Sequence, residues 1–279
     1  MIVIRRRDTG DQLVQVDSDS LAGASLAGAA LMYAALTGAT LQKSDLRAAD
    51  LCNADLRGAS FAGADLTSAD LTLATATGAD FRRALLSDSR LQAINLAEAG
   101  NAGTLFDDGD LTRIVLKNSN LSGASFENSI MHRADLTHCR LTGATMRAAQ
   151  LSGADLSFAD LRGADLSFAM LLNARFDGAD LRDANLCEAD LSYASFNGAR
   201  LNGVNFERAR CSKTSFARID DLHRVKGLES VRWDDDSAVD LHSLRSSVAE
   251  LADEVLVHLG VRTSEIPALR ALLCDVSAA

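Results

Sequence analysis

The stretch GADLSFADLRGADLSFA, residues 153–169, shows the rule that organises most of this chain. A large apolar residue, usually leucine, stands at every fifth position, and a small residue, nearly always alanine, stands two positions before it. A polar residue, most often aspartate, separates the two, and two variable residues, the second often glycine, complete the unit. The same register begins at Leu21 and continues without an insertion to Phe216.

A period of five matches neither the helical period of 3.6 nor the strand period of 2 taken alone. On a short extended segment, positions two apart point the same way, so the small residue and the large apolar residue both face inward. The polar residue between them then faces solvent. The two variable residues are rich in Gly, Ser and Asn, which favour turns. The sequence therefore predicts a tube whose backbone hydrogen bonds run between successive coils.

The phenylalanines indicate how many repeats close one coil. Eight of the ten occupy the large inward position, and several of these are separated by 20 residues, whereas none are separated by 15. The pairs are Phe61 and Phe81, Phe106 and Phe126, Phe176 and Phe196, and Phe196 and Phe216. Stacking of like residues favours four five-residue sides per coil, which gives about ten coils. At roughly 4.8 Å per coil, the rod is on the order of 48 Å long.

This unit resembles the A(D/N)LXX consensus of the pentapeptide repeat family over residues 21–216. Membership implies an all-β fold, a right-handed quadrilateral β-helix with leucine or phenylalanine ladders inside. The resemblance also implies possible partners. Family members of the quinolone-resistance and albicidin-resistance type act on DNA gyrase as DNA mimics, and some members dimerise through a C-terminal helix.

Both ends of the tube need a cover over the apolar core. Residues 1–20 are predicted to be an N-terminal hairpin cap, with apolar segments on either side of the turn DTGD at residues 8–11. Residues 217–279 are predicted to be a C-terminal cap and helical tail, in which Asp234–Ser237 supply the N-cap of a helix that ends near Gly260. Ser264 and Glu265 begin a second helix.

The first of these helices carries one apolar stripe. Its residues follow spacings of three and four and are Leu241, Leu244, Val248, Leu251 and Val255. Such a stripe either covers the last coil or pairs with a second copy of the chain to form a homodimer.

The middle coils break the repeat rule, because Ala76 and Asn101 occupy large inward positions. One interpretation is a ladder of amides with local repacking, in which Ile94 and Ile114 fill the space. The other is a bend or a partner contact within residues 98–110. An inward Asn without hydrogen-bond partners costs about 1–3 kcal/mol.

The sequence offers no pattern typical of an enzyme. No GxGxxG, P-loop or GxSxG motif is present, the five histidines lack ligand spacing, and the five cysteines form no CxxC pair. A net charge of −10 disfavours direct nucleic-acid binding, and no apolar stretch approaches the roughly 18 residues that span a membrane. We therefore expect a cytoplasmic, non-enzymatic protein with no cofactor and no metal.

The four outer sides of the predicted tube differ in charge. The side that begins at Leu26, here the acidic side, has nine acidic residues against three arginines, and the side that begins at Leu21, the basic side, has seven basic residues against four aspartates. The residues of the acidic side are Asp45, Asp65, Asp88, Asp107, Asp108, Glu127, Asp165, Glu188 and Glu207. The side that begins at Leu31 is nearly neutral and gathers apolar residues that we expect to be exposed: Tyr33, Leu73, Ile130, Met170, Leu172 and Tyr193.

Two functions follow from these sides. The acidic side predicts a DNA-mimic rod that binds a type II topoisomerase, DNA gyrase or topoisomerase IV, and protects it from an inhibitor. The apolar side favours the alternative, a protein–protein interaction scaffold without a topoisomerase role. Binding through the acidic side should weaken steeply with salt, whereas binding through an apolar interface should not.

Overall fold

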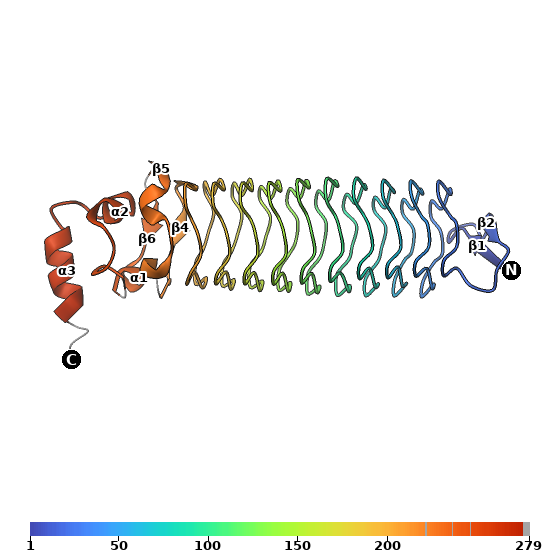
Figure 1. Ribbon diagram of the computed structural model, residues 1–279, viewed down its shortest axis with the longest axis horizontal. Coiled ribbons are helices and arrows are strands. Elements are labelled where there is room, and N and C mark those ends of the chain that lie inside the picture. Colours follow the sequence, from blue (N-terminus) through green and yellow to red (C-terminus); the bar gives the residue numbers. More distant parts are fainter. Residues whose placement is uncertain (221, 236, 246, 276–279) are drawn as a thin grey trace.

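The computed structural model describes residues 1–220, 222–235, 237–245 and 247–275, and shows a long rod of stacked coils (Figure 1). Parallel β-bridges join residues 20 positions apart, from Ser25 with Asp45 to Ser195 with Ser215. This is the spacing predicted from the phenylalanines. A hairpin lies at one end of the rod and short helices lie at the other.

Each repeat is held by hydrogen bonds to the coils on both sides. Asp155 donates its N–H to the carbonyl of Ala134 at 2.9 Å, and Leu156 donates to the carbonyl of Arg175 at 2.7 Å. At the corner to the next repeat, the N–H of Ala159 closes a turn on the carbonyl of Leu156 at 3.1 Å. Because this network satisfies the backbone polar groups coil by coil, the leucine and alanine side chains can be buried without unpaired backbone around them.

The core is a set of stacked columns. The inward phenylalanines are fully buried, and all four predicted pairs stack with nearly parallel rings. Their ring centroids lie 4.7 Å apart for Phe61 and Phe81, and 5.5 Å apart for Phe196 and Phe216. The ladders of large side chains that the sequence predicts are therefore confirmed.

The middle coils contain no ladder of inward amides. Asn101 is fully buried; within the described residues its amide nitrogen donates only to the carbonyl of Ala99 at 3.4 Å, and its Oδ1 has no hydrogen-bond partner. The residues 20 positions away in the same column are Phe81 and Leu121, and neither has a side-chain amide that could bond to Asn101. Backbone bonds between coils continue through this region, since the Asn101 N–H donates to the Asn120 carbonyl at 2.9 Å.

The N-terminal hairpin consists of β1 (Ile2–Arg5) and β2 (Gln12–Val16), which pair antiparallel. Ile4 is buried against the core. Two backbone bonds attach the hairpin to the adjacent coil: the Arg7 N–H donates to the Tyr33 carbonyl, and the Ala35 N–H donates to the Arg5 carbonyl, both at 2.8 Å.

Coiling continues past Phe216 with longer repeats. The strand β3 (Arg210–Ser212) pairs in parallel with β5 (Arg232–Asp235), and β4 (Ser215–Phe216) pairs with β6 (Ala238–Val239). Two 3-10 turns, η1 (Leu222–Arg224) and η2 (Leu228–Ser230), lie between these strands in the chain. The bridged residues are now more than 20 positions apart, as in Arg210 with Arg232, which is why the five-residue pattern is lost here.

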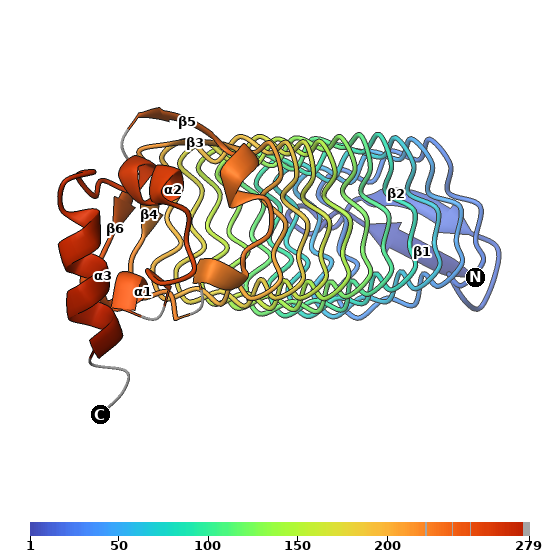
Figure 2. The ribbon, with the colours of Figure 1, turned by 60° about the vertical axis from the view of Figure 1, so that its left-hand side comes forward.

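Three helices follow: α1 (Leu241–Arg245), α2 (Asp253–His258) and α3 (Ile266–Asp275), which lie beyond the last coil (Figure 2). The predicted N-cap at Asp234–Ser237 is wrong, because Asp234 belongs to the strand β5. Residue 236, which was part of this prediction, lies outside the described residues. Asp240 caps α1 instead, and its Oδ1 accepts from the Ser243 N–H at 2.9 Å.

The predicted single helix with one apolar stripe is also wrong. The stripe residues are divided between α1, a turn and α2. Leu244, Val248, Leu251 and Val255 are buried in the chain itself, whereas Leu241 is 66% exposed. These four side chains extend the core beyond the last coil, which leaves them unavailable to a second copy of the chain.

Candidate functional site

The acidic side is partly neutralised by its own arginines. Five of its nine acidic residues lie within 4.0 Å of a guanidinium nitrogen. Arg47 contacts Asp45 and Asp65, Arg147 contacts Glu127, and Arg208 contacts Glu188 and Glu207. These exposed pairs are weak individually, but they reduce the negative field that a partner would meet.

An Asp-x-Arg sequence produces the closest of these contacts. Because the intervening residue points inward, the Asp and Arg both face solvent, and the guanidinium folds back onto the carboxylate with two bonds. Arg47 donates to the two carboxylate oxygens of Asp45 at 2.9 and 2.7 Å, and Arg57 donates to those of Asp55 at 2.8 and 2.6 Å. Hydrogen bonds from these arginines lower the pKa of Asp45 and of Asp55 to about 2.

The other four acidic residues form no ion pair with a described residue: Asp88, Asp107, Asp108 and Asp165. Three of them lie together on adjacent coils, since Asp88 and Asp108 share one turn position and Asp107 precedes Asp108. Asp107 accepts the N–H of Glu127 at 2.8 Å, and Asp108 accepts from the Asn128 amide at 3.2 Å. Uncompensated negative charge is therefore concentrated around residues 88–108.

The apolar residues expected on the Leu31 side do not form one surface. Met170, Leu172 and Tyr193 lie close together and are 52%, 40% and 49% exposed. Ile130 is half-buried. Leu73 is exposed, but it lies five coils away from Leu172, because the residue equivalent to Leu73 on the coil of Leu172 is Asn173.

Tyr33 is half-buried and lies beneath the hairpin. The guanidinium of Arg6 stands 4.4 Å from the centroid of its ring, and that of Arg7 stands 5.7 Å away. This aromatic side chain belongs to the N-terminal cap.

Phe168 is a further exposed apolar residue next to Met170 in the same coil. The sequence pattern alone did not assign it to the same group as Met170, Leu172 and Tyr193. It is 42% exposed, and the Arg147 guanidinium lies 4.6 Å from its ring centroid. Its position in the repeat, the second turn residue, was a sufficient signal that it faces outward. We call these four residues the C-terminal apolar patch.

The described part of the chain contains no group of three or more His, Cys, Asp or Glu residues arranged to hold a metal ion. No helix within the described residues has the length and hydropathy needed to cross a membrane. Burial raises the pKa of the Cys139 and Cys211 thiols to about 12, so neither is a ready nucleophile.

Comparison with known proteins supports the repeat assignment. The family described as "Pentapeptide repeat region" matches residues 129–206, and that described as "Pentapeptide repeats (8 copies)" matches residues 34–72, 44–83 and 110–147. The chain belongs to the pentapeptide repeat family. None of the curated proteins matches it.

Solved structures of other pentapeptide repeat proteins are similar to this family member. HetL, which is involved in heterocyst differentiation regulation in the cyanobacterium Nostoc, is 30% identical over 77% of this chain and 90% of its own, with a TM-score of 0.38. A thylakoid-lumen protein of Arabidopsis thaliana is 34% identical over 36% of this chain and 66% of its own, with a TM-score of 0.29. A trypsin-treated variant of QnrB1, a plasmid-mediated fluoroquinolone resistance protein, is 19% identical over 81% of this chain and 90% of its own, with a TM-score of 0.33.

Proposed function

We propose that this pentapeptide repeat protein is a non-enzymatic, DNA-mimic-like rod that binds a type II topoisomerase, DNA gyrase or topoisomerase IV, and protects it from an inhibitor. The observation that supports this function is the acidic side, whose nine carboxylates are distributed over three outward positions of the repeat along the rod. The cluster Asp88, Asp107 and Asp108, which lacks ion pairs with described residues, is the centre of the proposed contact.

The spacing of charge sets an expectation for affinity. Nine acidic residues along roughly 48 Å give about one charge per 5 Å, whereas duplex DNA carries one per about 1.7 Å. The arginines on the same side reduce the field further. Binding should therefore be weaker than that of DNA itself and should fall steeply as salt is added.

The test is a gyrase supercoiling assay with the purified protein, with and without a quinolone or an albicidin-like poison. Inhibition of supercoiling supports contact with the DNA-binding surface, and rescue from the poison supports protection. Absence of both effects at tens of micromolar protein contradicts the proposal.

A second candidate function rests on the C-terminal apolar patch. Phe168, Met170, Leu172 and Tyr193 are exposed apolar residues on two adjacent coils, and such a grouping suits an interaction scaffold. Tyr193→Ser together with Leu172→Ser should abolish capture of such a partner at both low and high salt. If capture depends on salt and survives these changes, this alternative is wrong.

Within the proposal, the protein acts in the cytoplasm as a right-handed, quadrilateral β-helix of about ten coils. A homodimer through the C-terminal segment would use Leu241 and Leu272, which are each 66% exposed, because the rest of the predicted stripe is buried. Sedimentation of the Leu241→Ser, Leu272→Ser variant tests this: a dimer that persists contradicts the assigned contact.

A further inference from the structure

Two hollows meet at the corner between the basic side and the side that begins at Leu36, near the C-terminal end of the rod. The first has a volume of about 530 Å³ and is lined by residues that include Phe158, Asn197, Gly198 and Arg218. The second has a volume of about 300 Å³, and its lining includes Arg182, Arg200 and Arg218. Gly198 and Arg218 line both, so the two hollows adjoin and together form one groove.

One column of turn positions forms the length of this groove. Phe158, Gly178, Gly198 and Arg218 follow one another at intervals of 20 residues, on successive coils. The Phe158 ring is 60% exposed and stacks on His138 with centroids 5.1 Å apart. It also leans over Gly178, where an added Cβ would meet the ring at 2.7 Å.

The next position in the column is empty. A Cβ built on Gly198 would meet no atom within 4 Å. The hollow is therefore open above Gly198, which stands in the column between Gly178, covered by the Phe158 ring, and Arg218. Planar rings stack well between such groups, because both faces of the ring are then in contact with a flat or cationic partner.

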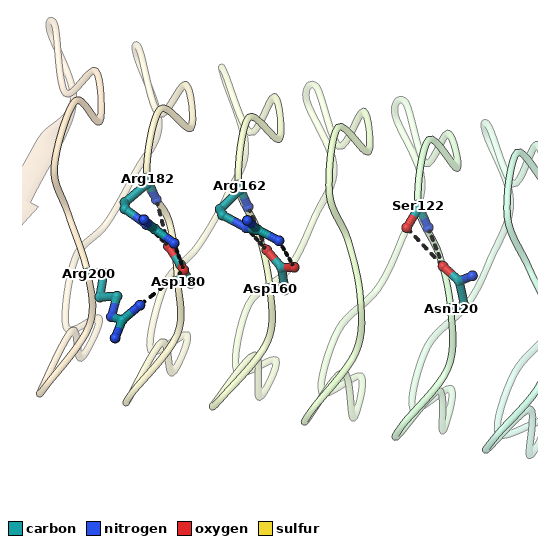
Figure 3. A network of polar contacts seen from close by, with 7 residues as sticks. All are labelled: Asn120, Ser122, Asp160, Arg162, Asp180, Arg182 and Arg200. Carbon is teal, nitrogen blue, oxygen red and sulfur yellow. Dashed lines mark hydrogen bonds and ion pairs between the residues drawn. The ribbon is translucent and has the colours of Figure 1, made fainter.

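The second hollow contains guanidinium groups that are incompletely paired. Arg182 is fixed to the carboxylate of Asp180 by two bonds of 2.8 and 2.6 Å, but Arg200 reaches the same carboxylate only at 3.7 Å (Figure 3). Arg218 forms no ion pair with any residue in the described ranges. Asp220 at the edge of the hollow is in contact with His242 at 2.8 Å.

We propose that this groove binds a nucleoside phosphate, with the base stacked over Gly198 between Phe158 and Arg218 and the phosphate held by Arg200 and Arg218. The two hollows adjoin at Gly198 and Arg218, so a nucleoside phosphate, in which a pentose separates the base from the phosphate, can place one group in each. Arginine is suited to the phosphate, since its planar fork donates two parallel hydrogen bonds. This site is independent of the topoisomerase proposal, which concerns the acidic side.

The test is a titration of the full-length protein with ADP, followed by calorimetry or by NMR of the ligand. ADP should bind at least tenfold more tightly than adenosine or pyrophosphate, because each of these fills only one hollow. Phe158→Ala and Arg200→Ala should each weaken ADP binding by at least tenfold.

A matched pair of glycine variants separates occupation of the slot from damage to the coil. Gly198→Asn places a side chain in the slot, and Asn tolerates the left-handed φ of 70° found there. Gly78→Asn makes the same change at the same turn position near the other end of the rod, where a Cβ also meets nothing within 4 Å. The first variant should lose ADP binding, and the second should retain it with unchanged circular dichroism.

Three results would overturn the proposal. They are absence of ADP binding at millimolar concentration, equal ADP binding by the Gly198→Asn and Gly78→Asn proteins, and tighter binding of a phosphotyrosine peptide than of ADP.

Discussion

Phe176 lies directly on Phe196, with ring centroids 4.8 Å apart and the two planes inclined by only 2°. This distance matches the roughly 4.8 Å that separates hydrogen-bonded strands, so the side chains follow the spacing of the backbone. A column of this kind keeps the core closely packed along the rod, because side chains of the two neighbouring coils cover both faces of each ring. Stability in such a solenoid comes mainly from contacts between neighbouring coils.

Phe196→Ala should therefore be strongly destabilising. Phe196 is fully buried between Phe176 and Phe216, and removing the ring leaves a cavity that the rigid coils cannot close. We expect a loss of about 3–5 kcal/mol in the free energy of unfolding, measured by urea denaturation. The control is Phe158→Ala, whose ring is 60% exposed and which should cost less than about 1 kcal/mol. Equal losses for the two variants would contradict the assignment of the ladder as the main source of stability.

Asn101→Leu should stabilise the protein. The buried Oδ1 of Asn101 has no hydrogen-bond partner among the described residues, and leucine has the same number of side-chain heavy atoms and restores the residue type usual at this position. Removing the unsatisfied oxygen should raise the free energy of unfolding by about 1–3 kcal/mol, seen as a higher Tm. Asn120→Leu, at a neighbouring outward position, should give no such gain. A lower Tm for the Asn101 variant would show that the amide serves a structural need.

Stability should decrease in acid through the Asp-x-Arg pairs. Hydrogen bonds from Arg57 and Arg162 lower the pKa of Asp55 and of Asp160 to about 2, below the value of about 4 expected in the unfolded chain. A lowered folded-state pKa gives stability that is present above pH 4 and is lost as the pH falls towards 2. The Asp55→Asn, Asp160→Asn variant should show a smaller decrease in its urea midpoint over this range. An unchanged pH dependence would mean that these pairs contribute nothing.

Charge reversal on the acidic side should abolish gyrase binding. The variant places lysine at four positions: Asp88, Asp108, Glu127 and Glu188. Lysines there would repel a surface built to hold DNA, so inhibition of supercoiling should be lost even at low salt.

The control reverses four exposed acidic residues elsewhere and so carries the same net charge. Its substitutions are Asp17→Lys, Asp19→Lys, Glu98→Lys and Asp183→Lys, all at exposed positions away from the acidic side. It should inhibit supercoiling as the natural sequence does. Loss of inhibition in both variants would point to net charge rather than to the acidic side, and retention in both would exclude electrostatic contact with gyrase.

Much of the rod could be predicted because its order is local. The Ala-x-Leu spacing sets which residues face inward, and like residues 20 positions apart indicate the length of a coil. The same register assigned the nine acidic residues to outward strand and turn positions on one side. It could not indicate that Arg47 folds back onto Asp45, because that depends on the rotamer of a long side chain.

The C-terminal segment could not be predicted in the same way. Its bridged residues are 21 to 23 positions apart, as in Asn205 with Lys226 and Ser215 with Ala238, so the periodic signal is lost although the coiling continues. The apolar spacing of three and four indicated a helix, yet α1 and α2 are separate, because Leu244, Val248, Leu251 and Val255 follow the shape of the end of the core.

The sequence alone determined the repeat, the inward ladders and the distribution of charge over the sides, since each follows from a period that the backbone imposes on its neighbours. Only the tertiary structure decided which exposed residues act together. Phe168 and Tyr193 lie on adjacent coils, and Phe158, Gly198 and Arg218 line one hollow, because residues 20 positions apart in the sequence are stacked on successive coils. Surface chemistry arises from packing in three dimensions, and no local rule of the chain specifies it.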